Sequence, residues 1–123
     1  MQTEKNIYSN CISFSFQFLD VNHHKFNVNG KQANYFQKLI DRLKDISSIE
    51  RRQLSGYSNK TLRFHSIKWV DTTERCFGIP NEDTIVEEPM QFSLSANEHG
   101  RVHGFFIENV FHIVWLDPNH ELY

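Results

Sequence analysis

The chain has 123 residues and a formal net charge of −2 at pH 7. This length suits a single domain spanning residues 1–123 and is too short for two. A hydrophobic content of 39% with 14% aromatic residues favours a folded globule over a disordered chain. The slightly negative charge excludes a global positive field that would attract nucleic acid or membranes. Any site for a polyanion would therefore have to be local.

The first residues, MQTEKNIYSNCISF, do not follow the pattern of a signal peptide, and no apolar run is long enough to cross a bilayer. Cys11 and Cys76 lie far apart in the sequence, which allows a disulfide but favours two thiols in a reducing compartment. We therefore expect a cytoplasmic protein without membrane contact.

Residues 11–21, CISFSFQFLDV, alternate between apolar and polar side chains and predict a half-buried strand. The polar run that follows ends in Asn29-Gly30, which predicts a chain reversal. Beyond it the apolar period becomes helical and predicts a helix whose core face is Ala33, Phe36, Leu39, Ile40 and Leu43.

Ser47 followed by Glu50 is typical of a capping box. It predicts a second helix that carries Arg51 and Arg52 and ends near Gly56. The two helices would form a helical hairpin.

Residues 61–70 alternate again and predict a strand, whereas 71–90 contain prolines and clustered acids that predict a solvated loop. Residues 91–95, 101–107 and 110–117 predict three further strands. We therefore expect an α+β fold: an N-terminal strand, the helical hairpin, then a three- to four-stranded antiparallel sheet with the helices on one face.

A two-residue turn at Glu108-Asn109 would set the register of the last two strands. The expected pairs are Ile107 with Val110, Phe106 with Phe111, Gly104 with Ile113, and Val102 with Trp115. The helices would then cover an apolar face. The other face, left free, would collect Ser93, Arg101, His103, Phe105, His112 and Val114.

His103 and His112 would be diagonal neighbours on that free face, close enough to share a phosphate. Imidazoles exchange protons near neutral pH, so the pair is a candidate for acid–base catalysis. The alternative is that both are half-exposed residues stacked on Phe105 or Val114. Arg101 on the same face is either a phosphate-binding group or a solvated cation at the strand end.

After the last strand, Pro118 ends the ladder and Asp117 is expected to accept hydrogen bonds from the turn backbone. His120 and Tyr123 would then fold back beside the sheet as further acid–base candidates, the alternative being a frayed terminus.

A second candidate surface, basic and near Phe64 and Trp69, would bind single-stranded RNA through base stacking. Its residues are Arg51, Arg52, Arg63, His65 and Lys68; the alternative is a solvated rim. No spacing typical of a metal site, a serine or cysteine nucleophile, or a glycine-rich phosphate loop is present in the sequence. We therefore expect neither a metal nor a cofactor.

The order of strand, helical hairpin and antiparallel sheet, with a terminus bearing His120 and Tyr123, resembles the RelE-type toxins of bacterial toxin–antitoxin systems. The resemblance implies a toxin that cleaves messenger RNA at the ribosome without a metal, with a cognate antitoxin as partner. It implies that Arg101 holds a phosphate and that His120 or Tyr123 is the terminal acid–base group; His103 has no counterpart.

The chain departs from that family in three respects. The family is strongly basic, its terminal His and Tyr are often adjacent, and it lacks the acidic segment at 81–88. The ending VWLDPNHELY also resembles that of small uncharacterised bacterial and phage-associated proteins, which supplies no function.

Two functions remain open from the sequence. One is a metal-independent endoribonuclease in which Arg101 stabilises charge on the phosphate. The other is a non-catalytic protein-interaction module, such as an accessory defence or mobile-element protein, that binds through Phe105, Val114 and Leu116.

Overall fold

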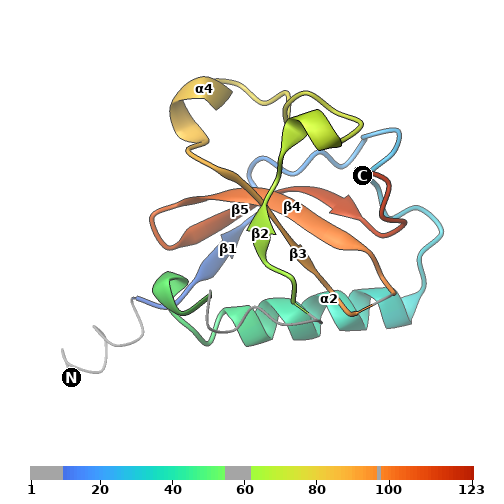
Figure 1. Ribbon diagram of the computed structural model, residues 1–123. Helices are drawn as coiled ribbons and strands as arrows, with labels where there is room; N and C mark the ends of the chain where they lie inside the picture. Colours follow the sequence, from blue (N-terminus) through green and yellow to red (C-terminus); the bar gives the residue numbers. More distant parts are fainter. Residues whose placement is uncertain (1–9, 55–61, 97) are drawn as a thin grey trace.

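A computed structural model describes residues 10–54, 62–96 and 98–123. This part of the chain forms one five-stranded sheet in the order β1-β5-β4-β3-β2 (Figure 1). Its strands are β1 (Ser13–Ser15), β2 (His65–Ser66), β3 (Pro89–Ser93), β4 (Arg101–Ile107) and β5 (Val110–Asp117). The helices are α2 (Ala33–Ile46) and α4 (Glu82–Ile85), with 3-10 turns η1 (Arg51–Gln53) and η2 (Trp69–Asp71). The α+β class is confirmed, but the sheet has five strands.

The hairpin of β4 and β5 is the part of the sheet that the sequence predicts best. Ile107 pairs with Val110 and Gly104 with Ile113, as expected. The register then shifts at a bulge, so that His103 pairs with Trp115. A β-bulge opposes two residues to one and therefore changes which side chains share a face. The predicted pair of Val102 with Trp115 is wrong, and Trp115 lies on the face away from α2.

The first strand is shorter than predicted. It pairs in parallel with β5, and only residues 13–15 form the ladder. The chain then turns, since the Leu19 N–H donates to the Phe16 carbonyl at 3.1 Å. Phe16 is 52% exposed, and Phe18 packs on the face opposite to that of Phe14. The prediction of one continuous strand over 11–21 is wrong because the chain crosses the end of the sheet.

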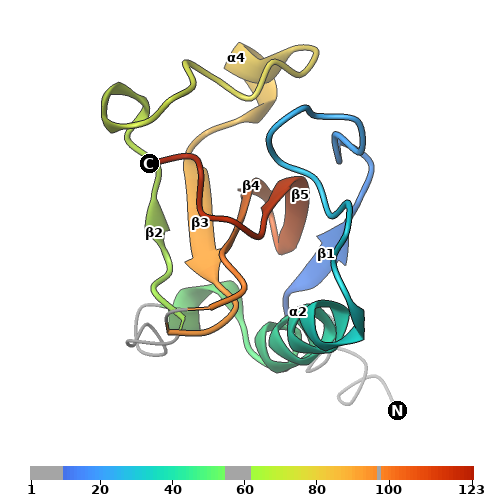
Figure 2. The same ribbon diagram turned by 90° about the vertical axis from the view of Figure 1, so that its right-hand side faces the viewer.

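Helix α2 covers one face of the sheet (Figure 2). Its buried residues are Tyr35, Leu39 and Ile46, spaced by four and seven positions. They pack with Val102, Phe92 and others into the first core cluster. Ala33, Phe36 and Ile40, predicted to face the core, are exposed. The buried stripe is rotated about the helix axis from the predicted one, so Phe36 and Ile40 lie beside it, 38% and 59% exposed.

The predicted second helix does not begin at Ser47. The hydroxyl groups of Ser47 and Ser48 both donate to the Lys44 carbonyl, at 2.7 and 3.1 Å, at the end of α2. The capping box lies three residues later, where the Gln53 side chain accepts the Glu50 N–H at 2.8 Å and caps η1. Gly56, the predicted end of that helix, lies outside the described residues.

Irregular segments cover the other face of the sheet (Figures 1 and 2). Phe26, Ile67, Phe77 and Leu122 pack there on Phe105, Val114 and Trp115 to form a second core cluster. Ile85 of α4 adjoins the same cluster, so the helices do not all lie on one face. The prediction of a face left open is wrong. Residues 71–90 are largely irregular and exposed, as predicted, but the segment also forms α4, begins β3 and buries Phe77 on this face. We call this side the loop face and the other the helix face.

The strand predicted over 61–70 is reduced to β2, whose two residues pair with β3. Trp69 begins η2 and contacts Phe77 and Trp115 edge-on, at ring centroid distances of 5.0 and 6.0 Å. The segment therefore leaves the sheet to join the second cluster. β2 remains as a short edge strand.

Candidate functional site

His103 is buried on the loop face, where its Nε2 lies 3.1 Å from Oδ2 of Asp117. Both side chains are fully inaccessible to solvent. Burial lowers the pKa of His103, although the Asp117 carboxylate acts in the opposite direction. The imidazole is therefore neutral near pH 7, with its Nε2–H donating to the carboxylate. Phe26 and Trp115 surround it, at ring centroid distances of 6.0 and 6.1 Å.

Asp117 also holds the C-terminal turn in place. Its carboxylate accepts the N–H groups of Glu121, at 2.8 and 3.0 Å, and of Leu122, at 3.1 Å. Burial raises the pKa of Asp117, but the hydrogen bonds from His103 and these amides outweigh it and keep the pKa below its ordinary value. Leu122 is fully buried, and its carbonyl accepts the Thr73 N–H at 2.8 Å. Backbone bonding by Asp117 and docking of the terminus are thus confirmed.

His112 stacks on Phe105, with ring centroids 5.3 Å apart and planes 15° apart, and also contacts Phe18. It is 8% exposed, and burial lowers its pKa. Stacking on Phe105 is therefore confirmed for His112, but the predicted half-exposure is wrong because the residue is buried. Neither His103 nor His112 is open to a substrate in this structure, so acid–base catalysis by this pair stays a prediction that burial does not favour.

The protein-binding surface predicted from the sheet is wrong. Phe105 and Val114 are completely buried in the second cluster, and Leu116 is buried in the first. None of the three offers the exposed apolar area that a protein interface requires.

Three basic side chains meet at the surface near Asp117, and we call Arg63, Arg101 and His120 the cation cluster. They come from three segments: the approach to β2, the start of β4, and the C-terminal turn. Burial and repulsion from Arg63 lower the pKa of Arg101, and Asp117 opposes them. Burial and repulsion from Arg101 and Arg63 lower the pKa of His120. The three groups are therefore close enough to interact electrostatically, and the interaction helps to lower the pKa values of Arg101 and His120.

Access differs within the cation cluster. Arg63 and His120 are exposed, whereas Arg101 is 8% exposed and donates to the Gly100 carbonyl at 3.3 Å. Arg101 is therefore not the solvated cation of the alternative prediction. Arg63 and His120 both have positive φ angles, of 48° and 55°, a conformation uncommon for residues other than glycine. Tyr123, which ends the chain, is 44% exposed.

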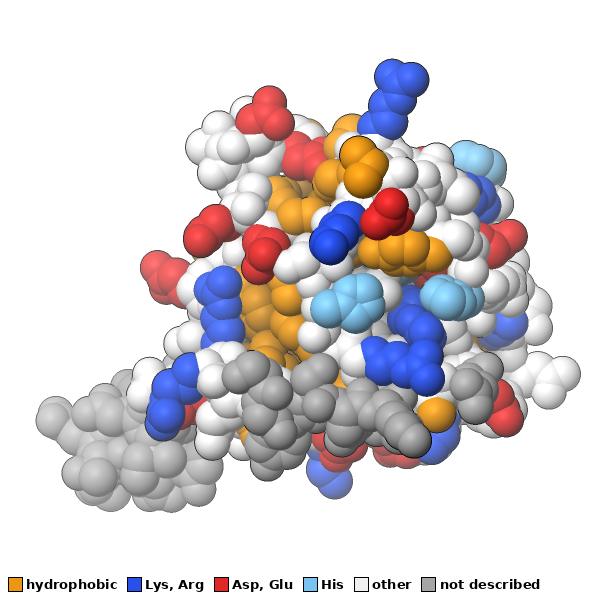
Figure 3. Space-filling view, viewed as in Figure 1, with side chains coloured by type: hydrophobic (Ala, Val, Ile, Leu, Met, Phe, Trp, Pro, Cys, Tyr) orange, Lys and Arg blue, Asp and Glu red, His pale blue; other side chains and the backbone are white. Residues whose placement is uncertain are grey.

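His65 and Lys68 extend this basic surface along the edge strand. Both side chains are exposed. His65 is held on both sides, with Nδ1 2.9 Å from the Ser66 carbonyl and Nε2 2.9 Å from the Gln91 amide nitrogen. Figure 3 shows histidine and Lys or Arg side chains side by side on this face of the molecule. Of the predicted RNA-binding residues, Arg63, His65 and Lys68 are all exposed and lie within six residues of one another along the chain.

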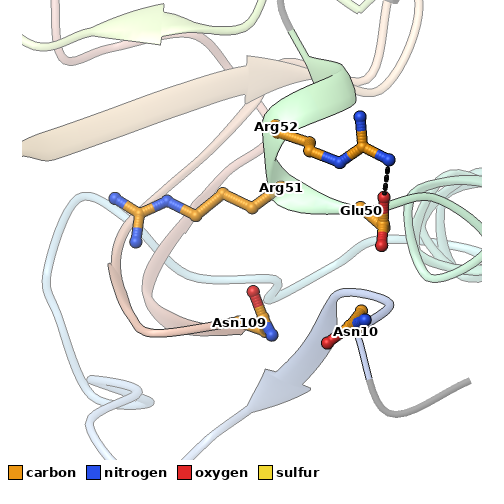
Figure 4. Close-up of a pocket in the computed structure, with 5 residues that line it drawn as sticks. All are labelled: Asn10, Glu50, Arg51, Arg52 and Asn109. Carbon is orange, nitrogen blue, oxygen red and sulfur yellow. Dashed lines mark ion pairs between the residues drawn. The ribbon is translucent and has the colours of Figure 1, made fainter. Parts of the chain in front are cut away.

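Arg51 and Arg52 belong to another region. They line a polar hollow of about 600 Å³ together with Asn10, Glu50 and Asn109 (Figure 4). Arg52 forms an ion pair with Glu50 at 2.7 Å, and in Figure 4 the Arg51 side chain extends away from that pair. The structure therefore divides the predicted basic surface into two parts.

A hollow of mixed polar and apolar lining lies on the helix face beside Arg51, and we call it the β2 groove. It measures about 260 Å³ and is lined by Arg51, Leu54, Phe64, Glu88, Met90 and Phe106. Apart from Arg51 and Phe64, sequence reasoning missed these residues. The available signal was the alternation along β3, since a period of two places Glu88 and Met90 on the same face as Phe92.

Within the described ranges, no group of three or more His, Cys, Asp or Glu side chains is arranged to hold a metal ion. Cys11 and Cys76 are both free thiols, as expected. In the same part of the chain, no helix has the length and apolar character needed to cross a membrane.

Comparison with known proteins adds no family: no family model, curated protein or solved structure matches this chain. The resemblance to RelE-type toxins therefore stays a prediction. The chemistry of the site consists of two arginines and an accessible imidazole beside a buried carboxylate.

Proposed function

We propose that this protein binds single-stranded RNA, with the cation cluster holding the phosphodiester backbone. The observation that carries the proposal is the convergence of Arg63, Arg101 and His120 from three separate segments. Arg101 pairs with Ser93, whose N–H donates to the carbonyl of Leu62, and with Asp117, whose carbonyl accepts the His120 N–H at 3.2 Å. A phosphate placed among them would relieve the repulsion between the two guanidinium groups and accept charge-assisted hydrogen bonds from both.

The charge of the whole molecule limits how RNA would bind. The chain carries a net charge of −2, so attraction must come from the local surface of the cation cluster with His65 and Lys68. A few phosphate contacts of this kind give a modest salt dependence, with a logarithmic slope of about 2 for three contacts to a single strand. A single strand also exposes its bases to the aromatic groove beside β2, which a duplex does not.

The binding proposal is tested with a fluorescently labelled 12-nucleotide RNA, using anisotropy at 50 and 200 mM salt. Arg63→Ala is expected to weaken binding about tenfold, because it removes one charged contact. Lys44→Ala, which removes an exposed cation from α2, should bind as the wild type does. Equal affinities for the two variants, or affinity that does not change with salt, would contradict the proposal.

Cleavage of the bound RNA is the second candidate, favoured by the state of His120. Its lowered pKa keeps the imidazole neutral near pH 7, as a general base requires. In the proposed reaction, His120 takes the proton of a 2′-hydroxyl group, whose oxygen attacks the adjacent phosphorus. The bond from phosphorus to the 5′-oxygen breaks, and that oxygen takes a proton from Tyr123. Arg101 stabilises the charge that develops on the phosphate, and the products are a 2′,3′-cyclic phosphate and a 5′-hydroxyl.

In this scheme His103 is a positioning residue. It acts through Asp117, which fixes the turn that carries His120. His112, stacked between rings, has no role in the chemistry.

Cleavage is tested by separating the products of a labelled RNA on a gel. His120→Gln and Tyr123→Phe are expected to slow cleavage at least 100-fold, since each removes one proton-transfer group. Expression of the wild type should arrest bacterial growth, and a folded Arg101→Ala variant should relieve the arrest. Intact RNA and healthy cells would reject cleavage and leave binding alone, and co-purification from the native host would then identify a ribosome, antitoxin or other partner.

A further inference from the structure

The β2 groove has an aromatic floor. Phe64 and Phe106 lie with ring centroids 6.0 Å apart, and Met90 and Leu54 complete the apolar lining. Phe64 is only partly buried although it packs on the first core cluster. Figure 3 shows hydrophobic side chains exposed in a hollow bordered by Lys or Arg side chains, acidic side chains and a histidine. A flat aromatic ligand would find rings to stack on there.

The polar groups of the groove are held in place. The Arg51 guanidinium lies over the Phe106 ring at 4.5 Å, and one of its N–H groups donates to the Glu108 carbonyl at 3.0 Å. An arginine has five N–H donors, so this bond leaves others for a ligand. Glu88 accepts the Ser66 hydroxyl at 2.7 Å through Oε2, and a carboxylate accepts several hydrogen bonds. The groove thus combines a fixed donor and a fixed acceptor around an aromatic floor.

We propose that the β2 groove binds a guanine base of single-stranded RNA. Guanine carries two neighbouring N–H donors, N1–H and the N2 amino group, which match the two oxygens of one carboxylate. Its O6 and N7 are acceptors, and arginine pairs with them readily. Adenine places an acceptor, N1, next to its amino group and would repel Glu88.

One RNA strand could place a base in the β2 groove and a phosphate at the cation cluster. Arg63 directly precedes Phe64, which lines the groove, so the two proposed contacts adjoin in the chain. A nucleotide that crosses the edge at β2 would therefore place its base on the helix face and its backbone near Arg63. The inference deepens the proposed function and rests on it for the class of ligand.

The test measures binding of three labelled 12-nucleotide RNAs by anisotropy: uridine throughout, and the same strand with one central guanosine or adenosine. The guanosine strand is expected to bind about tenfold more tightly than the adenosine strand. Glu88→Gln should abolish this preference without changing affinity for the uridine strand. Glu87→Gln, which alters the neighbouring exposed glutamate, is the matched control and should keep the preference.

The outcomes separate the two proposals. If all three strands bind equally to the wild type, the guanine site is rejected and RNA binding by the cation cluster stands. If no strand binds, guanosine monophosphate alone is titrated against wild type and Glu88→Gln. Binding lost only in Glu88→Gln supports the groove while RNA binding fails, and no binding to either protein overturns both.

Discussion

The two faces of the sheet are closed by different means. On the helix face, α2 is a straight rod that covers one strip, and the rest of the face keeps the β2 groove. On the loop face, irregular segments follow the surface of the sheet and bury even His103 and Asp117 completely. A regular element can cover only what its geometry reaches, whereas loops rich in aromatic residues can adapt to the surface below. The side chains that a ligand can reach therefore lie in the β2 groove and at the edge of the sheet.

The largest effect is expected from removing the Asp117 carboxylate, which is buried on the loop face. Asp117→Ala should lower the free energy of unfolding by about 3–5 kcal/mol, because it leaves three donors without their acceptor. They are the His103 Nε2–H and the N–H groups of Glu121 and Leu122. Urea denaturation measures the change. Asp83→Ala, at an exposed aspartate of α4, is the control; an equal effect of both would mean that the pair is not buried in solution.

Phe77 tests whether the irregular cover is packed as a core. It is 6% exposed and contacts Phe105 and Trp115 at ring centroid distances of 6.1 and 5.1 Å. Phe77→Ala should cost about 3 kcal/mol, since it leaves a cavity among rings. Phe36→Ala on the exposed side of α2 should cost less than about 1 kcal/mol. Similar losses in thermal or urea unfolding would show that Phe77 is not packed as a core residue.

The pH dependence of stability probes the buried imidazoles. The lowered folded-state pKa values of His103 and His112 mean that the unfolded chain, with histidine near 6.5, binds more protons as pH falls. Stability should therefore be highest above about pH 6.5 and should fall by about 1–2 kcal/mol between pH 7 and pH 5. His112→Phe, which keeps the stacked ring, should make this fall shallower. A constant free energy of unfolding over that range would contradict the assignment of neutral buried imidazoles.

The smallest expected effect lies on the outer surface of α2. Ile40 is 59% exposed, whereas its neighbour Leu39 is buried. Ile40→Ala should change the free energy of unfolding by less than about 0.5 kcal/mol, and Leu39→Ala should cost about 2–3 kcal/mol. A larger loss for Ile40→Ala than for Leu39→Ala would mean that Ile40 faces the core, as the sequence pattern predicts.

Sequence predictions that depend on neighbouring residues in the chain were correct more often than those that depend on distant contacts. The turn at Glu108-Asn109 fixes the pairing of Ile107 with Val110 through neighbours in the chain, and this was predictable. The bulge near Gly104 depends on how distant parts pack. A Cβ at Gly104 would collide with the His112 carbonyl and the Phe111 ring, so glycine admits the close approach, but its presence alone does not reveal the register shift.

The candidate site shows the same division. Arg101, His120 and Arg63 were identified by residue type, and the docking of the terminus on Asp117 followed from local turn chemistry. Their meeting at one place, and the separation of Arg51 and Arg52 from them, were not visible in the sequence. Neither was the burial of His103.

The sequence by itself determined the secondary structure of the C-terminal hairpin, the position of α2 and the α+β class, because alternation, helical period and turn residues act over a few positions. Tertiary structure alone decided which face water reaches. Burial depends on which distant segments cover a surface, and residues 16–30, 67–88 and 118–122 cover the loop face through contacts that no local pattern encodes.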